Sequence, residues 1–230
     1  MKANIDSALT GILVACALIT TGLVIHREFI APSMSAQRSN TERPVFVANW
    51  KSYIGDGVQL GQPTGRVQLI EFADFECPYC GQFHQTLKTL LQHYPDKVAL
   101  TFMHFPLKGH RFAIAAARVA ECADQQGRFA AMQDQLFEGQ ESFGLKPWTQ
   151  YATSAGVPDL AAFAACVQKT EPIPRVVKDE HLGNTLDVQA TPTLIINGWK
   201  LGHPPSEEEL DAMVKAVLAG KQPVSGARKS

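Results

Sequence analysis

The chain has 230 residues, of which 45% are hydrophobic and 19% are charged, and its formal net charge at pH 7 is −1. This composition is typical of a folded globular protein, and the length suffices for one domain with an added segment. Because the sequence has no basic cluster interleaved with aromatic residues, it does not indicate a nucleic-acid partner.

The N-terminus carries an apolar run of 18 residues, 8–25, without a charged side chain. As a helix this run is about 27 Å long, close to the hydrocarbon thickness of a bilayer. We therefore expect residues 1–27 to form an uncleaved signal anchor, a single transmembrane helix that attaches the chain to the membrane. A cleaved signal peptide with a weak cleavage site at residues 34–36 is the alternative. A lipoprotein cleavage site at Cys16 is less favoured, because the apolar run continues past it.

Residues 28–44 are rich in Ser, Pro and Arg and lack periodicity, which indicates a linker. In residues 44–65 a short apolar stretch precedes several glycines, and we expect one edge strand within a turn-rich segment. Residues 66–74 alternate and then become fully apolar, which predicts a buried strand.

The sequence Cys77-Pro78-Tyr79-Cys80 follows this predicted strand. Apolar residues at helical spacing begin at Phe83 and continue until Pro95, and residues 97–106 predict a second strand. The two cysteines therefore lie where a strand leads into a helix.

The rest of the chain is predicted to be mainly helical until a final hairpin. Gly127 divides one long helical pattern in two, and Asp159 has the side chain of an N-cap for a later helix. Further elements are predicted as a helix at 174–187, a strand at 193–196, a turn at Asn197-Gly198, a strand at 199–201 and a helix from the N-cap Ser206, with Glu209 completing its capping box, to Gly220.

Two cysteines separated by two residues at a helix start allow three interpretations. A zinc site needs two further Cys or His ligands at similar spacing, and the sequence offers none, so we expect no metal. A structural bridge between Cys77 and Cys80 would close almost no loop and would stabilise little. A redox-active disulfide is favoured, because the free N–H groups and the dipole of a helix N-terminus stabilise a thiolate. Cys77 is then an exposed nucleophile, Cys80 a more buried resolving thiol, and Pro78 occupies the first helical position, where no N–H is needed.

Pro192 stands directly before the predicted strand at 193–196. Proline cannot donate to a ladder in mid-strand, so it marks a strand entry or a cis turn. Taken alone, it is most simply an ordinary strand-starting proline.

Together, CPYC after "EFADFE", the distant "ATPTLIING" and the helical block between them resemble the thioredoxin superfamily, and more narrowly the DsbA-like thiol-disulfide oxidoreductases. The resemblance covers about residues 45–220. It implies an α/β thioredoxin fold over residues 45–222 with an all-helical insertion at about 107–172, followed by a polar tail at 223–230.

The same resemblance implies roles for individual residues. Pro192 corresponds to a cis-proline that faces the redox pair, and Thr191 to a neighbour that contacts the substrate backbone. Pro78 and Tyr79 lie between the cysteines, where the side chains meet substrate and set the redox potential. Glu71 matches a buried acid that relays protons for Cys80, although a solvent-facing strand residue is the alternative. We expect the remaining conspicuous side chains to be structural, namely Phe83, Phe105, His84, His104 and His110.

Cys122 and Cys166 both fall in the predicted insertion. They are either two small buried thiols or partners in a bridge, and some DsbA-like proteins carry such a second bridge. In an oxidising compartment a Cys122–Cys166 structural disulfide is favoured, and the chain-entropy model gives it roughly 3–4 kcal/mol.

The sequence as a whole predicts an extracytoplasmic thiol-disulfide oxidoreductase at a bacterial inner or plasma membrane, without a metal or organic cofactor. Its expected partners are thiol-containing or unfolded extracytoplasmic proteins and a membrane redox partner, either a quinone-linked reoxidase or an electron donor. A reductase or isomerase is the alternative, and a non-enzymatic chaperone or binding module is less favoured because CPYC is intact. An isomerase ranks below an oxidase, because the linker is too short to hold a dimerisation domain.

Overall fold

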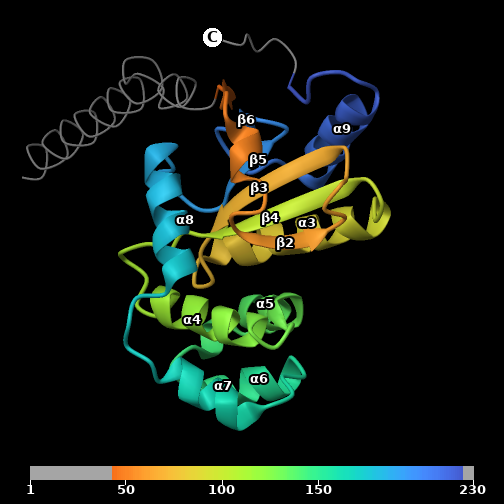
Figure 1. The fold of residues 1–230 in the computed structure, drawn as a ribbon. Coiled ribbons are helices and arrows are strands. Elements are labelled where there is room, and N and C mark those ends of the chain that lie inside the picture. The colour runs from red at the N-terminus through yellow and green to blue at the C-terminus, as the bar shows by residue number, and fades with distance from the viewer. Residues whose placement is uncertain (1–42, 225–230) are drawn as a thin grey trace, which may run out of the picture. The chain divides into compact units, whose positions relative to one another are not determined.

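In the computed structural model, which describes residues 43–224, the chain forms a mixed six-stranded sheet in the order β1-β6-β5-β3-β4-β2 (Figure 1). The central strands β3 (Val67–Ala73) and β4 (Val98–His104) are parallel, and every other neighbouring pair is antiparallel. The remaining strands are β1 (Val45–Phe46), β2 (Val58–Gly61), β5 (Thr193–Ile196) and β6 (Trp199–Lys200).

Helices cover both faces of this sheet. Helices α3 (Pro78–His93) and α9 (Glu207–Leu218) pack their apolar residues, among them Leu87 and Leu210, against one face. Helix α8 (Pro174–Thr185) contributes Leu182 to a second cluster on the other face, which includes Phe72. This arrangement is the thioredoxin fold that the sequence predicts.

A helical insertion separates β4 from α8 in the chain and lies beyond one end of the sheet, with α4 nearest the sheet and α6 and α7 farthest from it (Figure 1). It consists of α4 (Ala113–Asp124), α5 (Phe129–Glu138), the short 3-10 helix η3 (Gln140–Ser142), α6 (Trp148–Ser154) and α7 (Leu160–Val167). Gly127 has a positive φ of 68° between α4 and α5, which explains why the helical pattern breaks there. The insertion shares one apolar core with Phe75, Cys77 and Cys80, so it packs directly against the cysteine pair.

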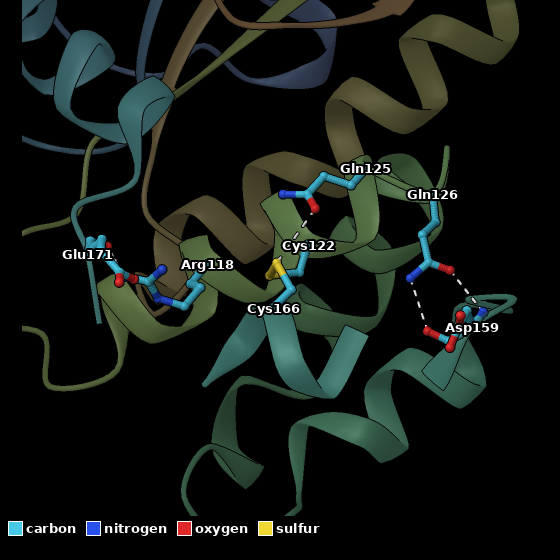
Figure 2. The surroundings of a disulfide bond; sticks show 7 residues. All are labelled: Arg118, Cys122, Gln125, Gln126, Asp159, Cys166 and Glu171. Carbon is cyan, nitrogen blue, oxygen red and sulfur yellow. Dashed lines mark hydrogen bonds between the residues drawn. A yellow bond between two sulfur atoms is a disulfide. The ribbon is translucent and has the colours of Figure 1, made fainter. Parts of the chain in front are cut away.

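A disulfide joins Cys122 in α4 to Cys166 in α7, with an S–S distance of 2.00 Å (Figure 2). It ties together the first and last helices of the insertion. This is the pairing expected from the sequence, and it excludes the alternative of two buried thiols in this structure.

Helix ends follow the predicted capping. The Asp159 side chain accepts a hydrogen bond from the N–H of Ala162, and Ser206 and Glu209 form a complete capping box at the start of α9. Residues 44–65 form two edge strands, β1 and β2, where one was expected, and these strands lie at opposite edges of the sheet. The 3-10 helix η2 (Trp50–Tyr53) lies between them in the chain. Strands of two and four residues are too short to show a period, so the sequence could not separate them.

Within residues 43–224, no helix combines the length and the apolar character needed to cross a membrane. The signal anchor predicted at residues 1–27 lies outside the described residues, as do most of the predicted linker and the last residues of the polar tail.

Candidate active site

Cys77 is the N-cap residue of α3, and Pro78 lies in the first turn of that helix. The N–H of Cys77 donates to the carbonyl of Asp74 at 3.1 Å, and the Cys77 carbonyl accepts the first helical bond from Gly81 at 3.2 Å. The strand β3 therefore delivers the first cysteine to a helix N-terminus, where free N–H groups favour an anion.

Cys77 is more covered than the sequence suggested. The residue is only 4% exposed, whereas we expected an exposed nucleophile. The cause is the segment before β5, since the Cys77 thiol donates to the carbonyl oxygen of Thr191 at 3.3 Å. Tyr79, by contrast, is 68% exposed and lies at the protein surface between the two cysteines in the chain.

The Thr191–Pro192 segment reaches Cys77 because the sheet brings distant strands together. Strand β5 pairs antiparallel with β3, with Leu194 opposite Glu71, so the residues before β5 lie beside the residues after β3. The peptide bond between Thr191 and Pro192 is cis. The Thr191 hydroxyl is buried and has no hydrogen-bond partner among the described residues. It is therefore free to donate to an ionised Cys77.

The two thiols differ strongly in acidity. Hydrogen bonding from the Cys80 thiol, opposed by burial and aided by Thr191 and by the N–H groups of Cys80 and Tyr79, lowers the pKa of Cys77 to about 5. Burial, the hydrogen bond to Cys77 and the negative charges of Glu71 and Cys77 raise the pKa of Cys80 far above its usual range. At neutral pH Cys77 is thus a thiolate and Cys80 a thiol. These are the protonation states expected for an attacking cysteine and a resolving cysteine.

Glu71 is fully inside the protein, at 1% exposure, so the alternative of a solvent-facing strand residue is wrong. It shares a face of β3 with Leu69 and Ala73, because side chains alternate along a strand. Both of its carboxylate oxygens lack a hydrogen-bond partner among the described residues, and burial raises its pKa to about 8. A carboxyl group with this pKa exchanges protons near neutral pH, next to a thiol whose acidity it influences.

Asp74 also lies at the site, and sequence reasoning missed it. Its fully buried carboxylate accepts hydrogen bonds from the N–H groups of Glu76 and Leu107 and contacts Nδ1 of His110 at 2.6 Å. These contacts fix the turn between β3 and α3. The sequence signal was an Asp at the end of a strand, a residue type that often bonds to the backbone two residues on.

Gln140 is a second residue of the site that the sequence did not reveal. From η3 in the insertion, its side-chain amide donates to the carbonyl of Phe75 at 2.7 Å and to that of Cys77 at 2.9 Å. The contact joins segments 63 residues apart in the chain, and no local pattern predicts it.

The three histidines expected from the sequence to be structural each contact an acidic side chain. His84 contacts Asp134, His104 contacts Glu121, and His110 contacts Asp74, each through a ring nitrogen. Phe83 and Phe105 are buried core residues. No group of three or more His, Cys, Asp or Glu side chains in the described part of the chain is placed to hold a metal ion.

A family model described as Thioredoxin matches residues 54–216, which is most of the chain. The chain belongs to this thioredoxin family. Among solved structures, this chain is similar to oxidised BdbD from Bacillus subtilis, with a TM-score of 0.65 and 21% identity over 78% of this chain and 99% of that one. It is also similar to alpha-DsbA1 from Wolbachia pipientis, with a TM-score of 0.60 and 23% identity over 70% of this chain and 90% of that one. These likenesses confirm the DsbA-like fold expected from the sequence.

Among curated proteins, the thioredoxin-family chain is 32% identical over 164 residues to a protein named Na(+)/H(+) antiporter NhaA 1 from Mycolicibacterium gilvum. The match covers 70% of this chain and only 26% of that protein. The chain therefore spans about a quarter of the length of the curated relatives that it matches first. A match of this extent relates one domain of the two proteins.

Proposed function

We propose that this chain is a protein thiol-disulfide oxidoreductase that acts as an oxidant, transferring the Cys77–Cys80 disulfide to thiol-containing proteins. The observation that carries the proposal is the placement of Cys77 as the N-cap residue of α3, where the Cys80 thiol and the N–H groups of Cys80 and Tyr79 lower its pKa to about 5. A stabilised thiolate means a stabilised reduced form, and a pair with a stable reduced form is a strong oxidant. The same thiolate is a good leaving group when the substrate departs.

The reaction starts from the Cys77–Cys80 disulfide. A thiolate of the substrate attacks Sγ of Cys77, the Cys77–Cys80 bond breaks, and Cys80 leaves with the bonding electron pair. A second substrate thiolate then attacks the substrate sulfur of the mixed disulfide and releases Cys77 as a thiolate. The substrate loses two electrons and two protons to form its disulfide, and the cysteine pair gains the two electrons.

Glu71 serves this cycle as a proton relay for Cys80. Cys80 departs as a thiolate in a buried environment that strongly disfavours its charge, so it must take up a proton as it leaves. Glu71, with a pKa of about 8, is protonated at neutral pH and can supply that proton. Thr191 and the Pro192 segment, which cover Cys77, position the substrate backbone beside the reacting sulfur.

The proposed setting is extracytoplasmic, with the N-terminal segment as a membrane anchor. The Cys122–Cys166 disulfide supports this location, because disulfides persist outside the cytoplasm. A solved relative described as a periplasmic thioredoxin-like protein from Salmonella enterica also supports it. An oxidase in this place requires a membrane partner that removes its electrons, such as a quinone-linked reoxidase.

The direction of electron flow is tested by equilibrating the full chain with mixtures of reduced and oxidised glutathione. For an oxidase we expect the reduction potential of the Cys77–Cys80 pair to be about −120 mV, whereas a potential of about −270 mV would indicate a reductase. In parallel, the oxidised protein is mixed with a reduced peptide that contains two cysteines. Formation of the peptide disulfide at a rate proportional to enzyme concentration supports the proposal, and its absence contradicts the oxidase function.

A further inference from the structure

Gln140 belongs to the helical insertion but contacts the redox pair. Its Nε2 atom donates to the Phe75 carbonyl at 2.7 Å and to the Cys77 carbonyl at 2.9 Å. Both carbonyls belong to the segment that leads from β3 into α3. One side chain of the insertion therefore binds the backbone directly before and at the first cysteine.

Gly81 provides an independent sign that this contact is closely fitted. A Cβ atom built at Gly81 would lie 2.8 Å from Oε1 of Gln140, closer than real Cβ contacts occur. The carboxamide therefore occupies the space beside the first turn of α3 that any residue other than glycine would fill. Gly81 has no positive φ that would otherwise call for glycine.

The contact has an electrostatic consequence for the nucleophile. The carbonyl of the N-cap residue carries a partial negative charge close to the sulfur of the same residue. A donor bound to that carbonyl places a partial positive charge beside it, which offsets part of the repulsion between the carbonyl oxygen and the thiolate. The carboxamide places its N–H side, the positive end of its dipole, toward this segment.

Resting on the proposed disulfide exchange, we propose that Gln140 is a positioning residue through which the helical insertion fixes the backbone of Cys77 and stabilises its thiolate. The insertion then contributes to the oxidising power of the pair as well as covering it. Without this amide, the reduced protein is less stable relative to the oxidised one.

The first test replaces Gln140 by leucine and by glutamate in the full chain. Gln140→Leu removes the donor, and we expect the pKa of Cys77 to rise by about 0.5–1. The equilibrium constant for reduction of the Cys77–Cys80 disulfide by glutathione should then fall about three- to tenfold. Gln140→Glu keeps the size but presents a negative charge, so its effects should exceed those of leucine. The pKa is followed by the ultraviolet absorbance of the thiolate, which needs no turnover.

The matched control is Gln126→Leu. Gln126 also lies in the insertion and also makes two backbone bonds, to the carbonyl and N–H of Asp159 (Figure 2), but Asp159 is not part of the segment that leads from β3 into α3. We expect this variant to lower the melting temperature without changing the pKa or the glutathione constant. The proposal is overturned if both Gln140 variants keep the wild-type pKa and constant, or if Gln126→Leu changes them equally.

Gly81→Ala gives a second test, because helix propensity and the proposed role of Gln140 predict different results for this variant. Alanine is the better helix former, so a purely local account predicts an equal or more stable helix and an unchanged pKa. If Gln140 acts as proposed, the new methyl group displaces the carboxamide and raises the pKa of Cys77, and it adds little when Gln140 is already leucine. Additive effects in the double variant would contradict the coupling.

These outcomes are separable from failure of the proposed function. If the wild-type protein does not oxidise the dithiol peptide, the oxidase function fails, whereas the thiolate titration still reports whether Gln140 stabilises Cys77. If the wild type is an oxidant and the Gln140 variants match it, only the role of Gln140 fails.

Discussion

The two cysteine pairs of the folded part stand in opposite physical situations. Cys77 and Cys80 are free thiols one helical turn apart at the N-terminus of α3. Cys122 and Cys166 are bonded across 44 positions of sequence and connect α4 with α7. One pair is placed at a helix dipole beside a buried acid, and the other closes a long loop.

This difference explains how one chain uses the same side chain for chemistry and for stability. Closing a loop of 44 residues removes conformational entropy from the unfolded chain, which the chain-entropy model values at roughly 3–4 kcal/mol. A bridge across two residues removes almost none, so the Cys77–Cys80 bond can open without unfolding the protein. Burial keeps Cys80 a thiol, and the hydrogen bond from that thiol, aided by Thr191 and by the N–H groups at the helix start, places the charge on Cys77.

Replacing Cys77 by serine is the largest expected perturbation. We expect Cys77→Ser to reduce oxidation of a dithiol peptide to below about a thousandth of the wild-type rate, because the Cys77–Cys80 disulfide can no longer form and no Cys77 sulfur remains for the substrate thiolate to attack. Stability should change little, since the pair closes no loop. Retained activity in this variant would indicate a chaperone or binding module in place of an enzyme.

The second pair should show the reverse pattern. The double variant Cys122→Ser with Cys166→Ser is expected to lose about 3–4 kcal/mol of unfolding free energy, measured by chemical denaturation of the oxidised protein. Its glutathione equilibrium should remain close to that of the wild type, because the bridge lies outside the contacts of Cys77. A change in that equilibrium without loss of stability would show that the two pairs are coupled.

The sequence predicted most of the fold because its signals are local. The strand at Thr193–Ile196, the capping box at Ser206 and the helix break at Gly127 each depend on neighbouring residues. The relation of Pro192 to Cys77 came from a family resemblance, since only strand pairing brings them together. The coverage of Cys77 and the contact of Gln140 depend on tertiary packing across long separations, and no pattern in the chain encodes them.

Glu71→Gln tests the buried acid that lies beside Cys80. The pKa of Glu71 is raised from 4.5 to about 8, so its burial costs the folded state increasingly as the pH rises between these values. The variant should therefore gain stability relative to the wild type across this interval and remain equal below it. Oxidation of substrate should slow by about tenfold at neutral pH, because Cys80 loses its proton donor.

Glu138→Gln is a matched control for this prediction, because Glu138 is exposed on α5. It should leave both the stability profile and the rate unchanged. If Glu71→Gln behaves like this control in the pH dependence of stability, the carboxyl does not titrate as its burial implies. If it gains stability but keeps the wild-type rate, Glu71 is structural and Cys80 receives its proton from another source.

The smallest effect is expected from Tyr79, which lies between the cysteines and is 68% exposed. Tyr79→His loses little packing and introduces an imidazole whose positive charge or N–H can stabilise the neighbouring thiolate. We expect the glutathione equilibrium to shift toward the reduced protein by about two- to fivefold, together with a lower pKa of Cys77. Tyr79→Phe removes only the hydroxyl and should match the wild type. The N–H of Tyr79 already stabilises the Cys77 thiolate, and both variants retain it. If Tyr79→His leaves the equilibrium unchanged, the side chain at position 79 does not set the potential of this pair.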